Sequence, residues 1–440
     1  MNCLNDFSCS GIYYITQVMQ AAYVEQVQRE SFRRKIEQVE HFSGRGTMDI
    51  HLLLEEAKRM HSQMIAWRRD FHQYPELAYE EVRTSQKVYD HLQSLGLEVA
   101  KGVGKTGVVG LLRGKEPGPT FLLRADMDAL PIPEAEKGIS YGSKVEGKAH
   151  LCGHDAHTSI LMAAAQILAN RGLQKGNIKF MFQPAEEGGA GAKAMIDDGV
   201  LENPRVDAAA ALHVSPAYDT GTLAVARGPG WAATNAINIR IIGQGGHAAA
   251  PHQTVDSIAV SAQVITALQQ VASRQVNPLD AVVLTIGQMT GGYARNVIAP
   301  EVHLSGTVRT LNPALREQMP DKIEKIIKGV TDAFGAGYEF EFLDGYPVLV
   351  NDDRMVDLFA ETSSIIAGSD RWQMISPGMG GEDFAFVAER VPSVMFRLGT
   401  RSGEETSYPL HHPSFNLDED ALPLGAAMLA SIALNYLSKH

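Results

Sequence analysis

The chain has 440 residues, of which 45% are hydrophobic and 20% charged, as expected for a globular protein that can bury a large core. A formal net charge of −12, from 39 Lys and Arg against 51 Asp and Glu, disfavours nucleic acid and anionic membranes as partners and favours a small molecule. Three cysteines are too few for a disulfide framework, and no apolar run reaches the ~20 residues of a membrane helix, so we predict a cytoplasmic protein.

The first segment, residues 1–47, looks unlike the rest of the chain and shows no clear pairing to a core. No basic residue precedes the apolar run over residues 12–24, so the run lacks the charged start of a signal peptide. We expect an amino-terminal extension of uncertain structure, and a docked helix over residues 21–42 stays open as the alternative. Met48 begins a helix-like segment and would make a natural chain start.

Helices and strands alternate after this segment. A helix is predicted over residues 80–95, where apolar residues recur at helical spacing and Gly96 follows as a stop signal. The alternation continues with strands over residues 107–113, 120–125, 178–183 and 208–213 and with helices over residues 155–170 and 191–198. This order is typical of a doubly wound α/β fold.

The pattern changes near residue 233. Strands are predicted over residues 236–242, 281–289, 301–311 and 338–343, and helices over residues 254–274 and 313–334. The resulting βαββαβ order is that of the ferredoxin-like split unit. We therefore predict an α+β domain inserted into the first domain.

The α/β pattern resumes after residue 345, with helices over residues 353–366 and 418–437 and a strand over residues 392–398. A chain of this length exceeds what one core usually covers, which also favours two domains. We predict a metal-binding catalytic domain formed by residues 48–232 and 345–440, interrupted by a dimerisation or lid domain over residues 233–344.

Residues of metal-ligating types recur along the first α/β segment. Cys152 and His154 stand at the start of a predicted helix, Glu186 and Glu187 follow one strand, and His213 ends another. Open α/β sheets bind ligands at the carboxyl ends of their strands, so we expect these side chains to converge. Thiolate, imidazole and carboxylate groups hold divalent ions, and a spare carboxylate beside a ligand can take a proton from water. The pattern predicts a hydrolytic metal site.

Each of these residues also has an ordinary interpretation. A single cysteine is commonly a small buried hydrophobic residue, and a histidine at the end of an apolar strand commonly lies in the core or at its rim. Paired glutamates commonly begin a solvated helix, where the helix dipole favours them. Their joint placement at separate strand ends is what favours the metal site.

Two other motifs are set aside, and a third is absent from the sequence. Residues 138–142 match the G-x-S-x-G pattern of serine hydrolases, but they lack the strand before and the helix after that this pattern needs. Residues 104–106 imitate the end of a phosphate-binding loop, although Val99 occupies the place of its first glycine. The sequence also contains no H-E-x-x-H helix of the common metalloprotease type.

Longer motifs occur in order along the chain. They are RDFH at residues 69–72, RADMDALP at 124–131, CGHDAH at 152–157, QPAEE at 183–187, GGHAA at 245–249, GEDF at 381–384 and HHP at 411–413. With these motifs the chain resembles the M20 metallopeptidase family from about residue 67 to residue 436. Within that family it is similar to the amidohydrolase branch, which includes hippurate hydrolases, N-acyl-amino-acid amidohydrolases and auxin-conjugate hydrolases.

The resemblance implies a two-metal site with a general base beside it. The implied ligands are Cys152, His154, Glu187, His213 and His411, and the implied base is Glu186. His411 is preferred to His412 because the family pattern is His, any residue, Pro. The ions are expected to be Mn²⁺, Zn²⁺ or Co²⁺, since this donor set admits all three.

Further site residues are expected on the inserted domain. The resemblance implies that His247 and Asn296 meet the substrate, and that His247 reaches into the neighbouring subunit's site in a homodimer joined through this domain. Two interpretations stay open for Arg309, a clamp for a substrate carboxylate or a surface arginine. Two also stay open for Asp128, which either orients a metal ligand or accepts hydrogen bonds from nearby backbone N–H groups.

These observations predict a metal-dependent amidohydrolase that releases a carboxylic acid and a free amino acid from an N-acyl amino acid. A dipeptidase or aminoacylase of the same fold is the nearest alternative. The alternative from another class is a catalytically silent, metal-binding dimer. Glu186 argues against the silent dimer, because a protein that only binds metal has no need of a free carboxylate beside its ligands.

Overall fold

The structure, a computed structural model, describes residues 46–136 and 138–440. The chain divides into two compact units, Met1–Leu52 and Leu53–His440. In the first unit the description begins with helix α2 (Gly46–Arg59), which runs on into the second unit. Most of the predicted extension, residues 1–45, lies outside the described residues, as does the alternative helix over residues 21–42.

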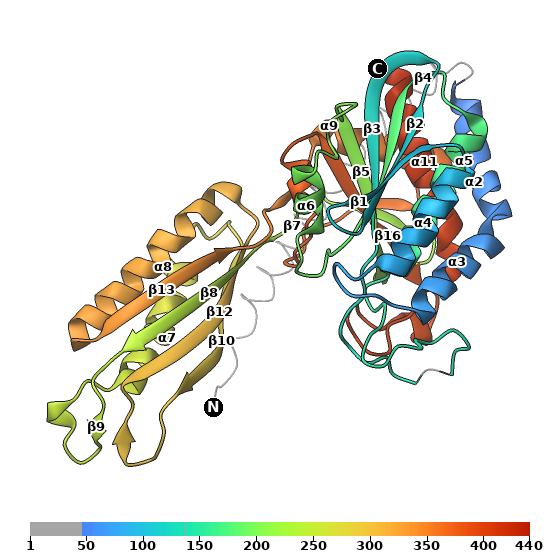
Figure 1. Cartoon of the computed structure of the whole chain (residues 1–440). Coiled ribbons are helices and arrows are strands. Elements are labelled where there is room, and N and C mark those ends of the chain that lie inside the picture. Colours follow the sequence, from blue (N-terminus) through green and yellow to red (C-terminus); the bar gives the residue numbers. More distant parts are fainter. Residues whose placement is uncertain (1–45, 137) are drawn as a thin grey trace, which may run out of the picture. The chain divides into compact units, whose positions relative to one another are not determined.

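The second unit contains an eight-stranded mixed sheet (Figure 1). In spatial order its strands are β1 (Glu98–Val103), β2 (Gly107–Arg113), β4 (Lys175–Gln183), β3 (Glu116–Asp126), β5 (Ala208–Asp219), β16 (Ser393–Arg401), β6 (Leu223–Val225) and β15 (Trp372–Met374). The central strands β4, β3, β5 and β16 are parallel, whereas β1 and β2 pair antiparallel at one edge. The parallel centre matches the predicted α/β pattern.

Helices cover both faces of this sheet, as successive side chains of β3 show. Leu122 belongs to a buried cluster with Met195 of α6 (Gly191–Asp197) and with Phe384 and Ala385 at the start of α10 (Ala385–Ala388). Phe121 points to the opposite face, where its ring lies 5.0 Å from that of Tyr436. The helices of the large sheet also include α3 (His61–Gln73), α4 (Val82–Ser94), α5 (His154–Arg171), α9 (Asp353–Ile366) and α11 (Leu422–Lys439). The prediction of a doubly wound α/β fold is confirmed.

Helix α11 is a core element of this fold. The segment Glu419–Lys439 is long and apolar enough to cross a membrane, with a mean hydropathy of 1.4, but 83% of its apolar window is buried inside the chain. The helix packs against α5 and β3. Its apolar composition is therefore explained by burial in the core.

A four-stranded antiparallel sheet forms the rest of the unit. Its strands in spatial order are β10 (Val282–Gly291), β12 (Glu301–Thr310), β8 (Ala233–Ile242) and β13 (Gly337–Asp344), and its helices are α7 (Ser257–Arg274) and α8 (Pro313–Phe334). With β8, α7, β10, β12, α8 and β13 in chain order, this is the ferredoxin-like arrangement that the sequence predicts. The division of the chain into separate domains stays a prediction, because both sheets belong to one compact unit.

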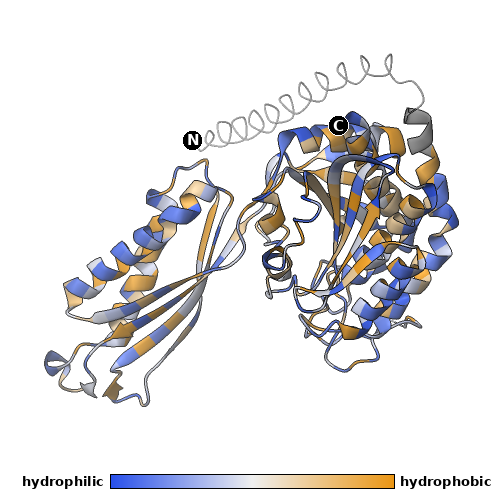
Figure 2. Cartoon of the chain, turned by 45° about the horizontal axis from the view of Figure 1, so that its top comes forward, coloured by the Kyte–Doolittle hydropathy of each residue, from blue (hydrophilic) through white to orange (hydrophobic). Residues whose placement is uncertain are grey.

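Alternation of side chains explains why helices cover one face of this smaller sheet. Ile237, Ile239 and Ile241 of β8 are buried against α7 and α8, and the strands alternate between hydrophobic and hydrophilic colours in Figure 2. Arg240, on the opposite face, forms ion pairs with Glu301 and Glu339 on the two neighbouring strands. The period of two thus sets one apolar and one polar face.

The predicted end of β5 is wrong. The sequence places His213 at the end of a strand over residues 208–213, whereas β5 continues to Asp219. The strand is extended because β16 pairs with it from Ala209 to Ser215 and again at Asp219, past a register shift, while its pairing with β3 stops at Ala211. His213 therefore lies within β5, just where the neighbouring strand β3 ends.

Short ladders escape sequence prediction because two to four residues show no period. They are β7 (Gly228–Trp231) with β14 (Leu349–Asn351) and β9 (Gly246–His247) with β11 (Val297–Ile298). The short helices are η1 (Pro251–Gln253), η2 (Glu404–Thr406) and η3 (Glu419–Ala421).

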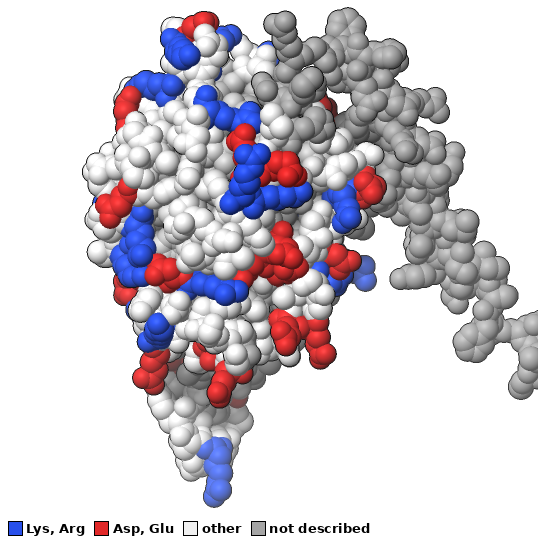
Figure 3. All heavy atoms as spheres, turned by 90° about the vertical axis from the view of Figure 1, so that its right-hand side faces the viewer, with Lys and Arg blue, Asp and Glu red and all other residues white. Residues whose placement is uncertain are grey.

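On the face shown in Figure 3, basic and acidic residues are interspersed, so this face of the described chain offers no basic surface for a phosphate backbone.

Candidate metal centre

The structure brings the six predicted metal-site residues together. Their ligand atoms form overlapping groups in which all atoms lie within 4.8 Å of one another, namely Cys152 with His154 and His213, Cys152 with Glu187 and His411, and His154 with Glu186 and Glu187. Most of these side chains are buried, and His411 is half exposed. The cluster lies where the central strands end, as expected for an open α/β sheet.

Gly153 sets the turn that presents Cys152 and His154. Its backbone is left-handed, with φ 87°, and α5 begins at the next residue. A Cβ at this position would lie 2.3 Å from Cγ2 of Val214 on β5. Glycine is therefore required here both by backbone conformation and by the close approach of β5.

We expect Gly153→Ala to destabilise the fold by at least about 2 kcal/mol, because left-handed strain and steric overlap add at this residue. Thermal unfolding of the metal-free protein measures the effect. Gly199→Ala is the matched control, since Gly199 has φ 88° but no atom within 4 Å of its Cβ position. Equal losses in the two variants would show that contact with Val214 carries no cost.

Asp128 binds the backbone of the two glutamates, Glu186 and Glu187. Its two carboxylate oxygens accept hydrogen bonds from the backbone N–H of Glu186 at 3.0 Å and of Glu187 at 2.9 Å. Its backbone carbonyl accepts a hydrogen bond from Nδ1 of His154 at 2.9 Å, and its carboxylate lies 3.3 Å from the same nitrogen. The contacts of Asp128 thus include both expected kinds, those to a candidate metal ligand and those to backbone N–H groups.

Two buried ligand atoms at the centre have no hydrogen-bond partner in the described chain. They are Nε2 of His154 and Oε1 of Glu187. Nε2 of His411 lies 3.1 Å from Oε1 of Glu187 but is not aligned for a hydrogen bond. Buried polar atoms are seldom left without partners, so their convergence fits a site that receives a cation.

The other two candidate ligands are also presented to the centre. Nδ1 of His213 donates a hydrogen bond to the carbonyl of Val214 at 2.7 Å. This leaves Nε2, which lies 3.5 Å from Sγ of Cys152, free to bind a metal ion. Burial raises the pKa of the Cys152 thiol well above its usual value and lowers the pKa of His213 well below its usual value. A neutral imidazole is the form that binds metal, and a buried thiolate needs a cation beside it.

The structure favours His411 over His412. His411 has a left-handed backbone with φ 67°, and its N–H donates to the carbonyl of Leu151 at 2.8 Å. His412 instead stacks on Tyr408 with ring centroids 4.8 Å apart, and its Nδ1 accepts from the N–H of Ser414. The loop thus directs His411 to the cluster and occupies His412 elsewhere.

A buried charge network that sequence reasoning missed lies behind Glu186. Arg124, fully buried on β3, pairs with Asp126 at 2.7 Å and with Glu382 and Asp383 at 3.0 Å each. Burial, followed by the carboxylates of Glu382 and Asp383, raises the pKa of Glu186 well above its usual value. The available signal was an arginine inside an apolar strand, because such an arginine needs carboxylate partners.

Asp126 and His157 also adjoin the cluster, but their polar atoms already have partners. The carboxylate of Asp126 accepts hydrogen bonds from Nδ1 of His157 at 2.6 Å and from Nη1 of Arg124 at 2.7 Å. Nε2 of His157 accepts the N–H of Val214 at 2.9 Å. These contacts favour a supporting role over ligation, and they agree with leaving Asp126 out of the ligand set.

The predicted substrate residues lie on or beside the smaller sheet. His247 is exposed on β9, and its Nδ1 accepts the N–H of Ala249 at 3.0 Å. The carbonyl of Asn296 accepts the N–H of Ala248, which places Asn296 beside His247. Neither residue belongs to the ligand groups found among the described residues. Arg309, on β12, has Nη1 3.6 Å from the Cβ position of Gly381, in the loop that carries Glu382 and Asp383.

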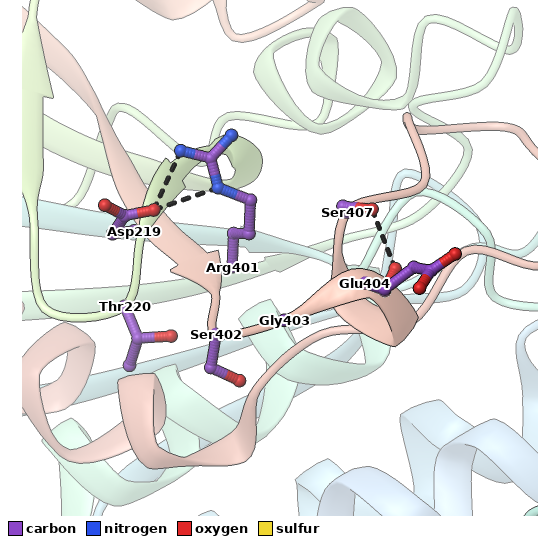
Figure 4. Close-up of a pocket in the computed structure, with 7 residues that line it drawn as sticks. All are labelled: Asp219, Thr220, Arg401, Ser402, Gly403, Glu404 and Ser407. Atoms are coloured by element: carbon purple, nitrogen blue, oxygen red, sulfur yellow. Dashed lines mark hydrogen bonds and ion pairs between the residues drawn. The ribbon is translucent and has the colours of Figure 1, made fainter.

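An open pocket of about 640 Å³ lies at the ends of β5 and β16 (Figure 4). It is lined by Asp219, Thr220, Arg401, Ser402, Gly403, Glu404 and Ser407. Arg401 is neutralised by Asp219 at 2.8 Å, and the Ser407 hydroxyl donates to the Glu404 carbonyl. The predicted site residues do not line this pocket, so it carries no part of the metal chemistry.

Comparison with known proteins gives consistent matches. Residues 122–435 match the model of peptidase family M20/M25/M40. Thermostable carboxypeptidase 2 of Saccharolobus solfataricus is 38% identical over 89% of this chain and 99% of its own length. An N-acyl-L-amino acid amidohydrolase of Geobacillus stearothermophilus is 44% identical over 70% of this chain and 82% of its own length. The crystal structure of a dinuclear metal binding peptidase of the M20 family from Bacillus subtilis superimposes with a TM-score of 0.75 at 34% identity, covering 87% of this chain and all of the other.

Proposed function

Because the chain belongs to peptidase family M20/M25/M40, we propose that it hydrolyses the amide bond of N-acyl amino acids, releasing a carboxylic acid and a free amino acid. The observation that carries this proposal is the convergence of five candidate ligands with the additional carboxylate of Glu186. The similarity to an N-acyl-L-amino acid amidohydrolase at 44% identity supports this substrate class.

The residues proposed to hold two divalent ions are Cys152, His154, Glu187, His213 and His411. Their donor set and the unpartnered atoms of His154 and Glu187 fit such ions, and a relative of this fold is itself a dinuclear metal binding peptidase. When bound, Mn²⁺, Zn²⁺ or Co²⁺ supplies positive charge that lowers the pKa of water and polarises the scissile carbonyl.

Glu186 is the proposed proton carrier. Its raised pKa makes its carboxylate a better base than an ordinary glutamate, so it accepts a proton from the attacking water. It then donates this proton to the nitrogen of the leaving amine as the amide C–N bond breaks. The backbone of Glu186 is fixed at both ends, since its N–H donates to Asp128 and its carbonyl accepts from the hydroxyl of Tyr346.

His247 is the proposed donor to the oxygen of the scissile carbonyl. Because Nδ1 accepts the N–H of Ala249, Nε2 is the ring nitrogen that can donate a hydrogen bond. Asn296 lies beside it as a proposed substrate contact, and Arg309 is the proposed clamp for the carboxylate of the amino acid. Asp128 is proposed to orient His154 as well as the glutamate pair.

A homodimer joined through the smaller sheet is part of the proposal. Strand β10 lies at an edge of that sheet, so one side of its backbone is available for pairing with another chain. Large apolar side chains are exposed on or near this strand, namely Val283, Met289, Tyr293 and Val297. An edge strand with this composition is suited to association with a second copy.

A cytoplasmic location stays a prediction from composition.

A peptidase activity is the second candidate function. Its support is the 38% identity to thermostable carboxypeptidase 2 over nearly the whole of both chains. A screen of N-acetyl, N-benzoyl and indole-acetyl amino acids and of dipeptides, with each of the three metals added, separates the candidates. Release of amino acids from the acyl substrates is the expected result. Release from dipeptides alone would favour the peptidase, and no hydrolysis with two ions bound would favour a silent metal-binding protein.

Replacing Cys152 by Ala is expected to weaken metal binding at least about tenfold, because the thiolate is the only sulfur donor in the candidate ligand set. Equilibrium dialysis followed by elemental analysis measures the bound ions per chain. The control is Ser159→Ala, a buried substitution on α5, the helix that follows Cys152; the Ser159 hydroxyl donates a hydrogen bond to the carbonyl of Ala156. Unchanged metal affinity in the Cys152 variant would remove this residue from the ligand set.

A further inference from the structure

Arg397 lies in the middle of the large sheet, where a charged side chain needs an explanation. It is on β16, opposite His213 of β5 on one side and Ala224 of β6 on the other. Paired residues of parallel strands point to the same face of a sheet. Arg397 therefore leaves the sheet on the same side as His213, at the level of the proposed metal centre.

The guanidinium of Arg397 lies over the indole ring of Trp231. Its Cζ lies 4.5 Å from the ring centroid of Trp231, whose side chain is buried. Nη2 lies 3.4 Å from the Cβ position of Gly378, so the absence of a side chain at Gly378 leaves room beside the guanidinium. A cation over an indole ring is attracted to its face, but this contact uses none of the N–H donors of the guanidinium in hydrogen bonds.

The missing feature is an anionic partner. Among residues 46–136 and 138–440 no hydrogen bond or ion pair to the guanidinium of Arg397 is found. Arg124, by contrast, pairs with Asp126, and Arg401, on the same strand as Arg397, pairs with Asp219. Burial lowers the pKa of Arg397, against the opposing effects of Tyr218, Glu382 and Cys152. Glu382 is itself paired with Arg124. Unused donors of a partly buried cation call for an acceptor from outside the chain.

We propose that Arg397 is a specificity-determining residue that binds a carboxylate of the substrate. The planar fork of N–H donors suits a carboxylate in bidentate geometry, and the register with His213 places it beside the reacting amide. Because Arg309 is the proposed clamp for the α-carboxylate, the carboxylate at Arg397 is an acidic side chain of the amino acid or an acid group on the acyl portion. This inference rests on the proposed hydrolysis of N-acyl amino acids and defines its substrates further.

The test compares Arg397→Met with the wild-type enzyme on substrate pairs that differ by one carboxylate. The two pairs are N-acetyl-L-glutamate with N-acetyl-L-glutamine, and N-succinyl-L-alanine with N-acetyl-L-alanine. We expect kcat/KM to fall about 10- to 100-fold, mainly through KM, for substrates that bear the recognised carboxylate. The matching substrate without it should lose less than about threefold, and the pair that responds identifies the carboxylate.

Two further variants separate recognition from a structural role. Arg397→Lys keeps the charge without the fork and should lose less than Arg397→Met on the responding substrate. Arg401→Met is the matched control, because this exposed guanidinium is already paired with Asp219, and it should leave every substrate unchanged. Equal losses for Arg397→Met on both members of both pairs would overturn the inference and assign Arg397 to the fold.

Binding provides a readout that does not depend on turnover. In the Glu186→Gln background, calorimetry should show the recognised substrate binding about 10- to 100-fold more weakly when Arg397 is also replaced by Met. Unchanged binding would overturn the inference. Hydrolysis by the wild type with charge-independent losses in the variant refutes the role of Arg397 alone, whereas a wild type that hydrolyses none of these substrates refutes the proposed function.

Discussion

Glu186→Gln is expected to lower kcat for N-acyl amino acids about 10²- to 10⁴-fold while leaving the metal content unchanged. The substitution replaces the proton-accepting carboxylate by an amide of nearly the same shape and leaves the proposed ligands in place. Because burial, and after it the carboxylates of Glu382 and Asp383, disfavours the charged form of Glu186, the neutral amide should not lower Tm. Steady-state kinetics with elemental analysis of the same samples measures both effects.

Glu187→Gln is the matched control for this experiment. The same chemical change one residue along the chain should lose bound metal, since Oε1 of Glu187 faces the cluster without a hydrogen-bond partner. Near-normal kcat in the Glu186 variant at full metal loading would contradict the assigned proton transfer. Loss of metal in both variants to the same extent would contradict the division of roles between the two glutamates.

Mixing two inactive variants should restore activity if each site receives His247 from the partner subunit. One variant carries Glu186→Gln and the other His247→Ala. When subunits exchange at random, up to about one quarter of the wild-type sites should be regained, because half of the dimers are mixed and each of these has one complete site. The physical reason is that His247 is exposed on β9 and is absent from the ligand groups of the described chain.

The rate of recovery after mixing measures this prediction, with subunit exchange followed independently by fluorescence energy transfer. Glu186→Gln mixed with a second Glu186→Gln preparation is the control and should stay inactive. Exchange without recovery would mean that His247 acts within its own chain or serves the fold only.

Long periodic elements were predictable because their pattern extends over several turns or strand repeats. Helix α8 was expected over residues 313–334 and spans Pro313–Phe334, with Asn312 capping its start and Gly335 its end. The βαββαβ order followed from six such elements. The extension of β5 beyond His213 was not predictable, since it depends on pairing with β16 nearly 200 residues later in the chain.

The candidate ligands were accessible to sequence reasoning because their residue types are unusual after buried strands. The supporting residues were less accessible. Glu382 and Asp383 acquire a role only through Arg124, which lies more than 250 residues earlier in the sequence. Arg397 looks like an ordinary arginine until the structure places it on Trp231 with its N–H donors unused. Such residues are defined by tertiary partners, which no local pattern encodes.

Removing and restoring the metal tests the central claim most directly. The enzyme is stripped with a chelator, verified by elemental analysis, and then titrated with Mn²⁺, Zn²⁺ or Co²⁺ while release of free amino acid from N-acyl amino acids is measured. The account predicts no release from the stripped enzyme and full recovery as bound metal approaches about two ions per subunit. Undiminished release from the verified metal-free enzyme, or no release on any N-acyl amino acid with both ions bound, would contradict it.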